Sequence, residues 1–148
     1  MQLKNKSVKK INASNLSVGV VVSRFNEEIT AELLETALQA LKSSQVKTAH
    51  IEVVSVSGAM EIPFALQKMA RRKKYDCLVA LGCVIRGDTP HFDYVCKTAQ
   101  EGVLRVSLDY ALPIGFGVMT VNTTKQAKAR IHVGSDAVMA ALELATLQ

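Results

Sequence analysis

The residues best suited to chemistry lie in one strand-turn-helix segment near the middle of the chain. Residues 77–84 form an apolar run that predicts a buried strand, and a turn with an arginine and a glycine follows it. Asp88 and Thr89 are good N-cap residues, and Pro90 suits the first position of a helix. A helix N-terminus binds phosphate well because its first N–H groups are unpaired. His91 comes next, so an imidazole able to transfer protons would stand beside an anion site.

The local sequence leaves one other interpretation open and excludes a second. An ordinary strand-turn-helix joint with a surface histidine would contain the same residues, since a short motif is only a hypothesis. The spacing of Gly82 and Gly87 resembles that of a P-loop, but Asp88 stands where a P-loop requires lysine. A nucleoside-triphosphate site is therefore excluded.

The elements that would position this segment alternate regularly along the chain. Four apolar runs predict strands, at 16–22, 50–56, 77–84 and 114–121. A segment with helical periodicity follows each of them, which predicts a parallel sheet covered on both faces. With right-handed crossovers, we expect an α/β fold, a three-layer flavodoxin-like sandwich with a four-stranded parallel sheet. One domain is expected over residues 1–148, with residues 1–15 as a flexible arm or an edge strand.

Local signals also predict where the helices begin and end. Asn26 is expected to cap the first helix with its side chain, and Thr123 with Gln126 matches a capping box. Gly134 is expected to interrupt the helical segment after the fourth strand, and Ser135 to cap a final helix. Two glycines, Gly115 and Gly117, are expected to break the fourth strand.

Residues able to bind a ligand lie at the ends of all four predicted strands, namely Phe25 and residues 58–61, 84–91 and 116–122. In such folds the ligand lies outside the carboxyl ends of the strands. Phe25 and Phe116 could stack on a flat heterocycle, and Glu61 could accept hydrogen bonds from a polyol or an amine. Arg130 could bind phosphate with two parallel hydrogen bonds. Each of these residues could instead serve packing or the surface, but their convergence on one edge favours a site around His91.

The charge pattern favours small anionic partners over nucleic acid. The formal net charge is +5, and much of it lies in the N-terminal arm and in residues 71–74. No aromatic residue is interleaved with the basic run, which is typical of a solvated helix end. The chain has no apolar stretch of membrane-spanning length, and no apolar core follows the lysines of the arm, so that arm is no secretory signal.

The three cysteines are interpreted as small buried hydrophobic residues. The spacing of Cys77, Cys83 and Cys96 fits neither a metal knuckle nor a C-x-x-C redox pair. A nucleophilic cysteine is disfavoured because neither strand cysteine has a base beside it in the sequence. Such usage indicates a reducing compartment, and we expect the protein to be cytoplasmic.

Three blocks of the sequence carry a family resemblance: Arg24 to Asn26, Ser57 to Pro63 and Gly82 to Val95. Together with residues 113–120 and 126–130, they resemble the 6,7-dimethyl-8-ribityllumazine synthase family over residues 18–146. The resemblance implies a transferase of riboflavin biosynthesis. Its reaction condenses 5-amino-6-(D-ribitylamino)uracil with 3,4-dihydroxy-2-butanone 4-phosphate, releases phosphate and water, and needs no cofactor or metal. It also implies a homo-oligomer, a ring of five with active sites between neighbours, and no nucleic-acid or membrane partner.

The resemblance assigns positions to the pyrimidine substrate. Phe25 would stack on its ring. Three residues after the second strand would hold the ring and its ribityl chain: Ala59, Met60 and Glu61. Backbone groups at the end of the third strand would also meet the ring, those of Cys83, Val84 and Ile85.

The resemblance assigns other positions to the phosphate substrate. Asp88 and Thr89 would meet its phosphate, and His91 would be the catalytic residue that transfers protons. Phe116 would line the site from the adjacent subunit, and Arg130 would bind phosphate there.

Two departures from the family pattern bear on these assignments. Many relatives have a small residue at the position of Asp88, and an acid there repels phosphate unless its backbone N–H is the ligand. Relatives that build sixty-subunit shells usually carry lysines after the position of Arg130, whereas residues 131–136 contain none. The sequence therefore favours a free pentamer over a shell, and the missing lysines remove a possible substrate contact.

Two other functions fit the same scaffold. A lumazine- or flavin-binding protein without activity would keep Phe25 but would not need His91 or Arg130, whose joint presence favours catalysis. A flavodoxin-like electron carrier would have a hydroxyl-rich phosphate loop after the first strand, which residues 23–26 do not supply.

Overall fold

The computed structural model describes residues 10–148, so the predicted character of residues 1–9 lies outside the described residues. Residues 10–15 form no strand. They are held to the domain at Ala13, which is fully buried and donates its backbone N–H to the carbonyl of Ser44 at 2.8 Å.

Four parallel strands form a single sheet in the described part of the chain. They are β1 (Val18–Ser23), β2 (Ile51–Val56), β3 (Cys77–Ile85) and β4 (Ile114–Val121). Their order across the sheet is β2-β1-β3-β4, and every neighbouring pair is parallel. The predicted flavodoxin-like sandwich is confirmed, with strand bounds that differ by at most two residues from those expected.

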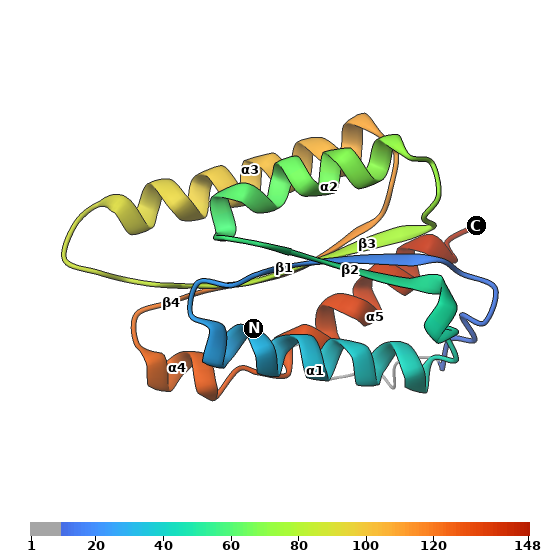
Figure 1. The fold of residues 1–148 in the computed structure, drawn as a ribbon, viewed down its shortest axis with the longest axis horizontal. Helices are drawn as coiled ribbons and strands as arrows, with labels where there is room; N and C mark the ends of the chain where they lie inside the picture. Colours follow the sequence, from blue (N-terminus) through green and yellow to red (C-terminus); the bar gives the residue numbers. More distant parts are fainter. Residues whose placement is uncertain (1–9) are drawn as a thin grey trace.

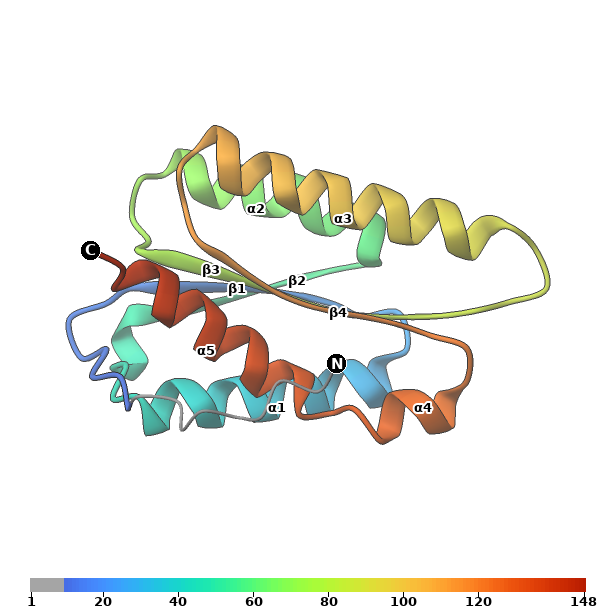
Figure 2. The same ribbon diagram turned by 180° about the vertical axis from the view of Figure 1, so that it is seen from behind.

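Helices cover both faces of this sheet. They are α1 (Glu27–Ser43), α2 (Ile62–Arg71), α3 (His91–Asp109), α4 (Thr124–Lys128) and α5 (Val133–Ala145). Two short 3₁₀ turns, η1 (Thr48–His50) and η2 (Ala59–Glu61), precede β2 and α2. Helices α2 and α3 lie on one face, and α1, α4 and α5 lie on the other, as both views show (Figures 1 and 2).

The core is divided between the two faces by the alternation of side chains along β3. Leu78, Ala80 and Val84 pack toward α2 and α3, whereas Val79 and Leu81 pack toward α1 and α5. A central strand buried on both faces has no polar side to present, which is why its sequence is continuously apolar.

The glycines of β4 and α5 permit close packing rather than interrupting their elements. A Cβ at Gly115 would collide with the carbonyl of Ala137 on α5, and β4 runs unbroken through it. Gly134 lies inside α5, against the carbonyl of Leu33 on α1. The predicted strand break is therefore wrong, and the helical segment is interrupted at residues 129–132 instead of at Gly134. Both glycines serve tertiary contacts that a local pattern does not contain. Ser135 does not cap a helix either, since its hydroxyl donates to the carbonyl of His132 at 2.8 Å.

The strand order creates a crevice between β1 and β3. The chain moves outward from β1 to β2 on one side and from β3 to β4 on the other. At such a switch point the loops after the two inner strands separate, and ligands bind outside the carboxyl ends. The loops after β1 and β3 hold the segments singled out in the sequence.

Candidate active site

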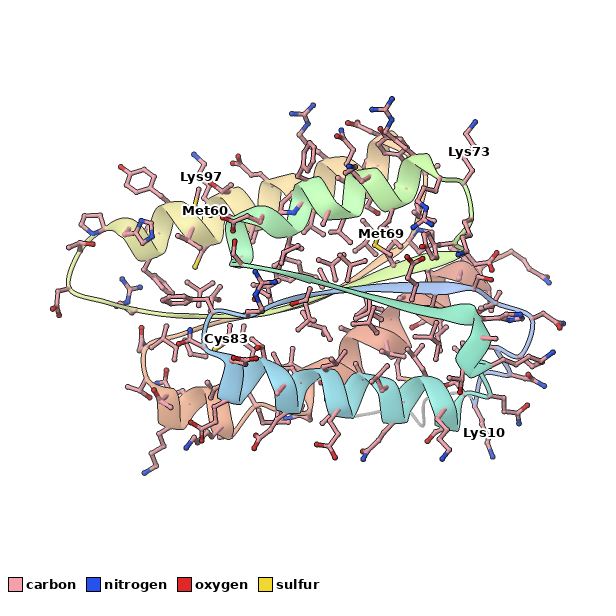
Figure 3. All side chains as sticks on the ribbon, viewed as in Figure 1. Lys10, Met60, Met69, Lys73, Cys83 and Lys97 are labelled. Carbon is pink, nitrogen blue, oxygen red and sulfur yellow. The ribbon has the colours of Figure 1, made fainter. Side chains whose placement is uncertain are left out.

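Three loops meet at the carboxyl edge of the sheet, and they hold most of the predicted site residues. They follow β1, β2 and β3, and the long loop after β3 projects farthest from the sheet (Figure 1). Met60 and Cys83 lie toward this edge, whereas Met69 lies toward the opposite one (Figure 3). The three blocks are thus brought together although they lie far apart in the sequence.

The loop after β1 is held rigidly and presents an aromatic ring to solvent. The backbone N–H of Arg24 donates to Val56 at 2.8 Å, and that of Phe25 donates to Ser57 at 2.9 Å. The side chain of Phe25 is 71% exposed. A large apolar ring on a backbone fixed at two points is poised for stacking.

Asn26 fixes the same loop in a way that the sequence did not predict. It occupies the N-cap position of α1, as expected, but its side chain makes no capping bond. Its backbone adopts the left-handed conformation, with φ 62°, which asparagine tolerates better than most residues. The side-chain N–H instead donates to the carbonyl of Cys83 at 2.9 Å, so it links the β1 loop to the end of β3.

The end of β3 extends past β1 and leaves one edge of its backbone in the crevice. The last β1–β3 pair is Val22 with Leu81, whereas pairing with β4 continues to Ile85. The backbone of Arg86 turns toward β4, where its N–H meets Val121 at 2.9 Å. Because successive residues of a strand face opposite neighbours, Ile85 faces the β1 side, beyond the end of β1.

The thiol of Cys83 takes no part in this edge. Its side chain is 2% exposed, and burial raises the pKa of the thiol to about 11. At neutral pH the group is an uncharged apolar filler, so Cys83 can contribute only its backbone to a ligand.

The turn after β2 places residues of different exposure next to each other. Ala59 is buried, whereas Met60 and Glu61 are exposed beside the loop after β1. The N–H of Glu61 donates to the carbonyl of Gly58 at 3.1 Å, which closes the 3₁₀ turn before α2. The carboxylate of Glu61 is free to accept hydrogen bonds from a ligand at this edge.

The loop after β3 keeps its polar residues in solvent. Asp88, Thr89 and His91 are all exposed. The expected cap is displaced, since Pro90 occupies the N-cap position and α3 begins at His91. The hydroxyl of Thr89 accepts a long bond, 3.4 Å, from the N–H of His91, and Asp88 does not cap the helix. The N–H of Asp93 donates to the carbonyl of Pro90 at 3.0 Å, so the first turn of α3 leaves the N–H of Phe92 for an anion.

Arg86 and Asn122 lie within the ranges that the sequence placed at strand ends, but sequence reasoning assigned neither of them a role. The Nε of Arg86 donates to the Oδ1 of Asn122 at 3.0 Å, and its Nη1 lies 3.7 Å from the carboxylate of Asp93. The guanidinium also stacks on the ring of Phe92, 4.4 Å from its centroid. In the sequence, both polar residues stand directly after a predicted strand, which marks them as candidates. That they pair with each other could be known only from the register of β3 and β4.

Within one chain, Phe116 lies away from this site, and Arg130 lies on the other face of the sheet from α3. Phe116 pairs with Ala80, so it lies about 16 Å along the strands from Ile85 at roughly 3.3 Å per residue. Phe116 is thus inside β4, whereas the sequence placed it among the residues at the end of this strand. Arg130 follows α4 on the face opposite α3, and its Nη1 donates to the carbonyl of Gln126 at 2.9 Å (Figure 1).

The capping box before α4 is confirmed in part. The N–H of Gln126 donates to the hydroxyl of Thr123 at 3.1 Å. The side chain of Gln126 accepts from the N–H of Asn122 at 2.7 Å, one residue earlier than the capping box predicts. This bond fixes Asn122, the partner of Arg86, to the start of α4.

Metal-binding clusters and membrane-spanning helices are both absent from residues 10–148. Within this range, no group of three or more His, Cys, Asp and Glu side chains is arranged to hold a metal ion. None of its helices combines the length and the apolarity that crossing a membrane requires.

The family comparison covers the same elements that build this edge. A family model described as 6,7-dimethyl-8-ribityllumazine synthase matches residues 15–148. The matched range includes all four strands, all five helices and the three loops at the carboxyl edge.

Proposed function

The chain belongs to the 6,7-dimethyl-8-ribityllumazine synthase family, enzymes of riboflavin biosynthesis, and on that premise we propose its reaction. It condenses 5-amino-6-(D-ribitylamino)uracil with 3,4-dihydroxy-2-butanone 4-phosphate and releases phosphate and water. The course is imine formation between the amine and the ketone, elimination of phosphate, tautomerisation and ring closure. The family match carries this proposal, and the convergence of three loops on one edge supports it.

The pyrimidine occupies the crevice between β1 and β3. Phe25 stacks on its ring, since its side chain is exposed while its backbone is fixed to Ser57. The backbone of Ile85 faces the crevice and forms hydrogen bonds with the polar edge of the ring. Glu61 accepts hydrogen bonds from the ribityl chain.

The loop after β3 binds the phosphate substrate. Phosphate takes the N–H of Phe92 at the start of α3, where the helix dipole favours an anion. Thr89 adds a hydroxyl, whereas Asp88 contributes only its backbone, because its carboxylate is an acceptor without a proton to donate. His91 is the first residue of the helix and transfers protons beside the leaving phosphate.

A neighbouring subunit completes the site. Both residues are exposed; Phe116 lies inside β4, away from the loop that holds His91, and Arg130 follows α4 on the face of the sheet opposite α3. We place them in the site of the adjacent chain, where Arg130 binds phosphate and Phe116 lines the pocket. This arrangement requires a closed ring of identical chains, and we propose a free homopentamer.

The test is to mix the purified protein with the two substrates in a buffer that contains a metal chelator. We expect the lumazine chromophore to form with an equal amount of phosphate. A folded protein that binds the product but makes none would contradict the enzymatic function and favour a binding protein of the same family.

A further inference from the structure

The loop after β3 has no buried residues over 87–90 that could hold its shape. Residues 87–90 are all exposed to solvent. A Cβ placed on Gly87 would meet no atom within 4 Å, so the space beside this residue is open. The shape of the loop therefore depends on what fixes its two ends.

Arg86 contacts the structures on both sides of this loop. Its backbone N–H donates to Val121 at 2.9 Å, and its Nε donates to Asn122 at 3.0 Å, which joins the start of the loop to the end of β4. Its Nη1 lies 3.7 Å from Asp93, and its guanidinium stacks on Phe92, both in the first turn of α3. One side chain thus spans the loop from the sheet to the helix.

The contacts of Arg86 require a guanidinium. Only a planar group with several N–H donors can bond Asn122, approach Asp93 and stack on Phe92 at once, and a lysine ammonium cannot. The pairing with Asp93 also offsets a negative charge in the helix turn where the proposed phosphate would bind.

We propose that Arg86, held by Asn122, is the positioning residue that keeps the β3–α3 loop in its phosphate-binding shape and orients His91. This inference rests on the proposed function, because it assigns the loop to the phosphate of the substrate. Arg86 acts through the loop, since its donors are directed to Asn122 and Asp93 of its own chain.

The first experiment separates positioning from folding by steady-state kinetics. In Arg86→Gln we expect the KM for the butanone phosphate to rise about fivefold, a size suited to a half-exposed charged contact. The KM for the pyrimidine substrate should change by less than about twofold, since Phe25 is held on the loop after β1 and the backbone of Ile85 is held by its pairing with Val121 of β4. A loss of stability alone would lower the active fraction, and hence kcat, without moving one KM selectively.

Variants of the partner residue decide whether Arg86 acts through the loop. Asn122→Ala should raise the same KM. In the double variant this KM should be little higher than in either single variant, because both substitutions break one interaction. Arg71→Gln is the matched control, since Arg71 is exposed in the last turn of α2 and should leave both KM values unchanged. A normal KM in Asn122→Ala with a raised KM in Arg86→Gln would mean that Arg86 binds phosphate itself and would overturn the positioning role.

A measurement without substrate keeps the inference separate from the proposed function. Hydrogen exchange followed by mass spectrometry should be faster over residues 84–95 in Arg86→Gln and in Asn122→Ala. It should stay as in the wild type in Asn122→Asp, which keeps the acceptor for Arg86. Unchanged exchange in Arg86→Gln would overturn the proposal, whereas a wild-type protein that makes no lumazine would contradict only the function.

Discussion

At the level of single residues, the proposed site consists mainly of exposed side chains on a fixed backbone. Phe25 is 71% exposed, Met60 is 45% exposed, and Glu61 and His91 are also open to solvent. Groups that must meet a ligand have to remain available, so these residues contribute little to the core. Substitutions at these positions should change activity much more than stability.

His91 should be important for rate rather than for binding. In His91→Ala we expect kcat to fall by about tenfold to a hundredfold, because positioning supplies much of the acceleration and a lost proton carrier only part. The dissociation constant of the pyrimidine substrate should be nearly unchanged. Stopped-flow assays together with equilibrium titration measure both quantities, and wild-type turnover in the variant would refute the proton-transfer role.

The cysteine thiols should make the folded protein sensitive to alkaline pH. Burial raises the pKa of Cys77 to about 12 and that of Cys83 to about 11, and it also raises that of Cys96. An unfolded thiol loses its proton near about pH 8.5. Above that pH the unfolded state holds fewer protons than the folded state, so the free energy of unfolding should fall as the pH rises.

Urea denaturation at about pH 8 and about pH 9.5 checks this expectation, and the midpoint should be lower at the higher pH. Cys77→Ala is the control, because removing one buried thiol should reduce the difference between the two midpoints. A thiol reagent should label the three cysteines slowly until urea is added. Fast labelling of the folded protein would contradict their assignment as buried, protonated groups.

At the level of elements, the length of β3 decides where the ligand can bind. β3 continues four residues beyond its last pair with β1, and β4 accompanies it to Ile85. The overhang exposes backbone groups beside the loop after β1. The side chain of Asn26 occupies one of these groups, since it donates to the carbonyl of Cys83. The crevice is therefore formed by the ends of the strands.

The packing of α1 against α5 should be sensitive to a single methyl group. In Gly134→Ala the new Cβ would collide with the carbonyl of Leu33 and the hydroxyl of Thr36, so we expect a loss of about 1–3 kcal/mol in unfolding free energy. Gly87→Ala is the control, because no atom lies within 4 Å of its added Cβ. Urea denaturation compares the two variants, and equal stabilities would show that the helices can separate at little cost.

At the level of the whole molecule, the single chain has surfaces that suit self-association. Large apolar side chains stay exposed on the outer side of α2 and α3, among them Phe64, Leu104 and Leu108. Apolar groups of this size are favourably buried when chains associate. Phe116 adds an exposed ring on the edge strand β4.

A mixing experiment tests the shared site. Phe25→Asp and Arg130→Glu should each abolish most activity, and both residues are exposed, so neither variant should unfold. In mixed rings assembled from equal amounts, about a quarter of the sites would combine an intact Phe25 with an intact neighbouring Arg130. Recovery of about that share of wild-type activity is expected, and no recovery would place Arg130 in the site of its own chain or outside any site.

The mass of the native assembly tests the proposed ring directly. Five chains of 16.0 kDa give about 80 kDa, and native mass spectrometry measures this value. A monomer would contradict the proposed shared site, and a sixty-chain particle would contradict the inference drawn from the missing lysines.

The sequence by itself determined the fold class and the order in which the candidate site residues occur at the ends of the strands. Continuous apolar runs identify strands that are buried on both faces, because water is excluded from both sides of β1 and β3. The alternation with helical segments then forces parallel crossovers, and parallel strands bring all their carboxyl ends to one edge. For that reason Phe25, Glu61 and His91 could be assigned to one edge from their positions after strands.

Only the tertiary structure decided the contacts between segments distant along the chain. The bonds from Asn26 to Cys83 and from Arg86 to Asn122 depend on the strand register, which local propensity does not encode. The glycines Gly115 and Gly134 resemble breaks in the sequence but are sites of close helix packing in three dimensions. A local pattern reports what the backbone prefers, whereas these features follow from which neighbours the folded chain brings within van der Waals distance.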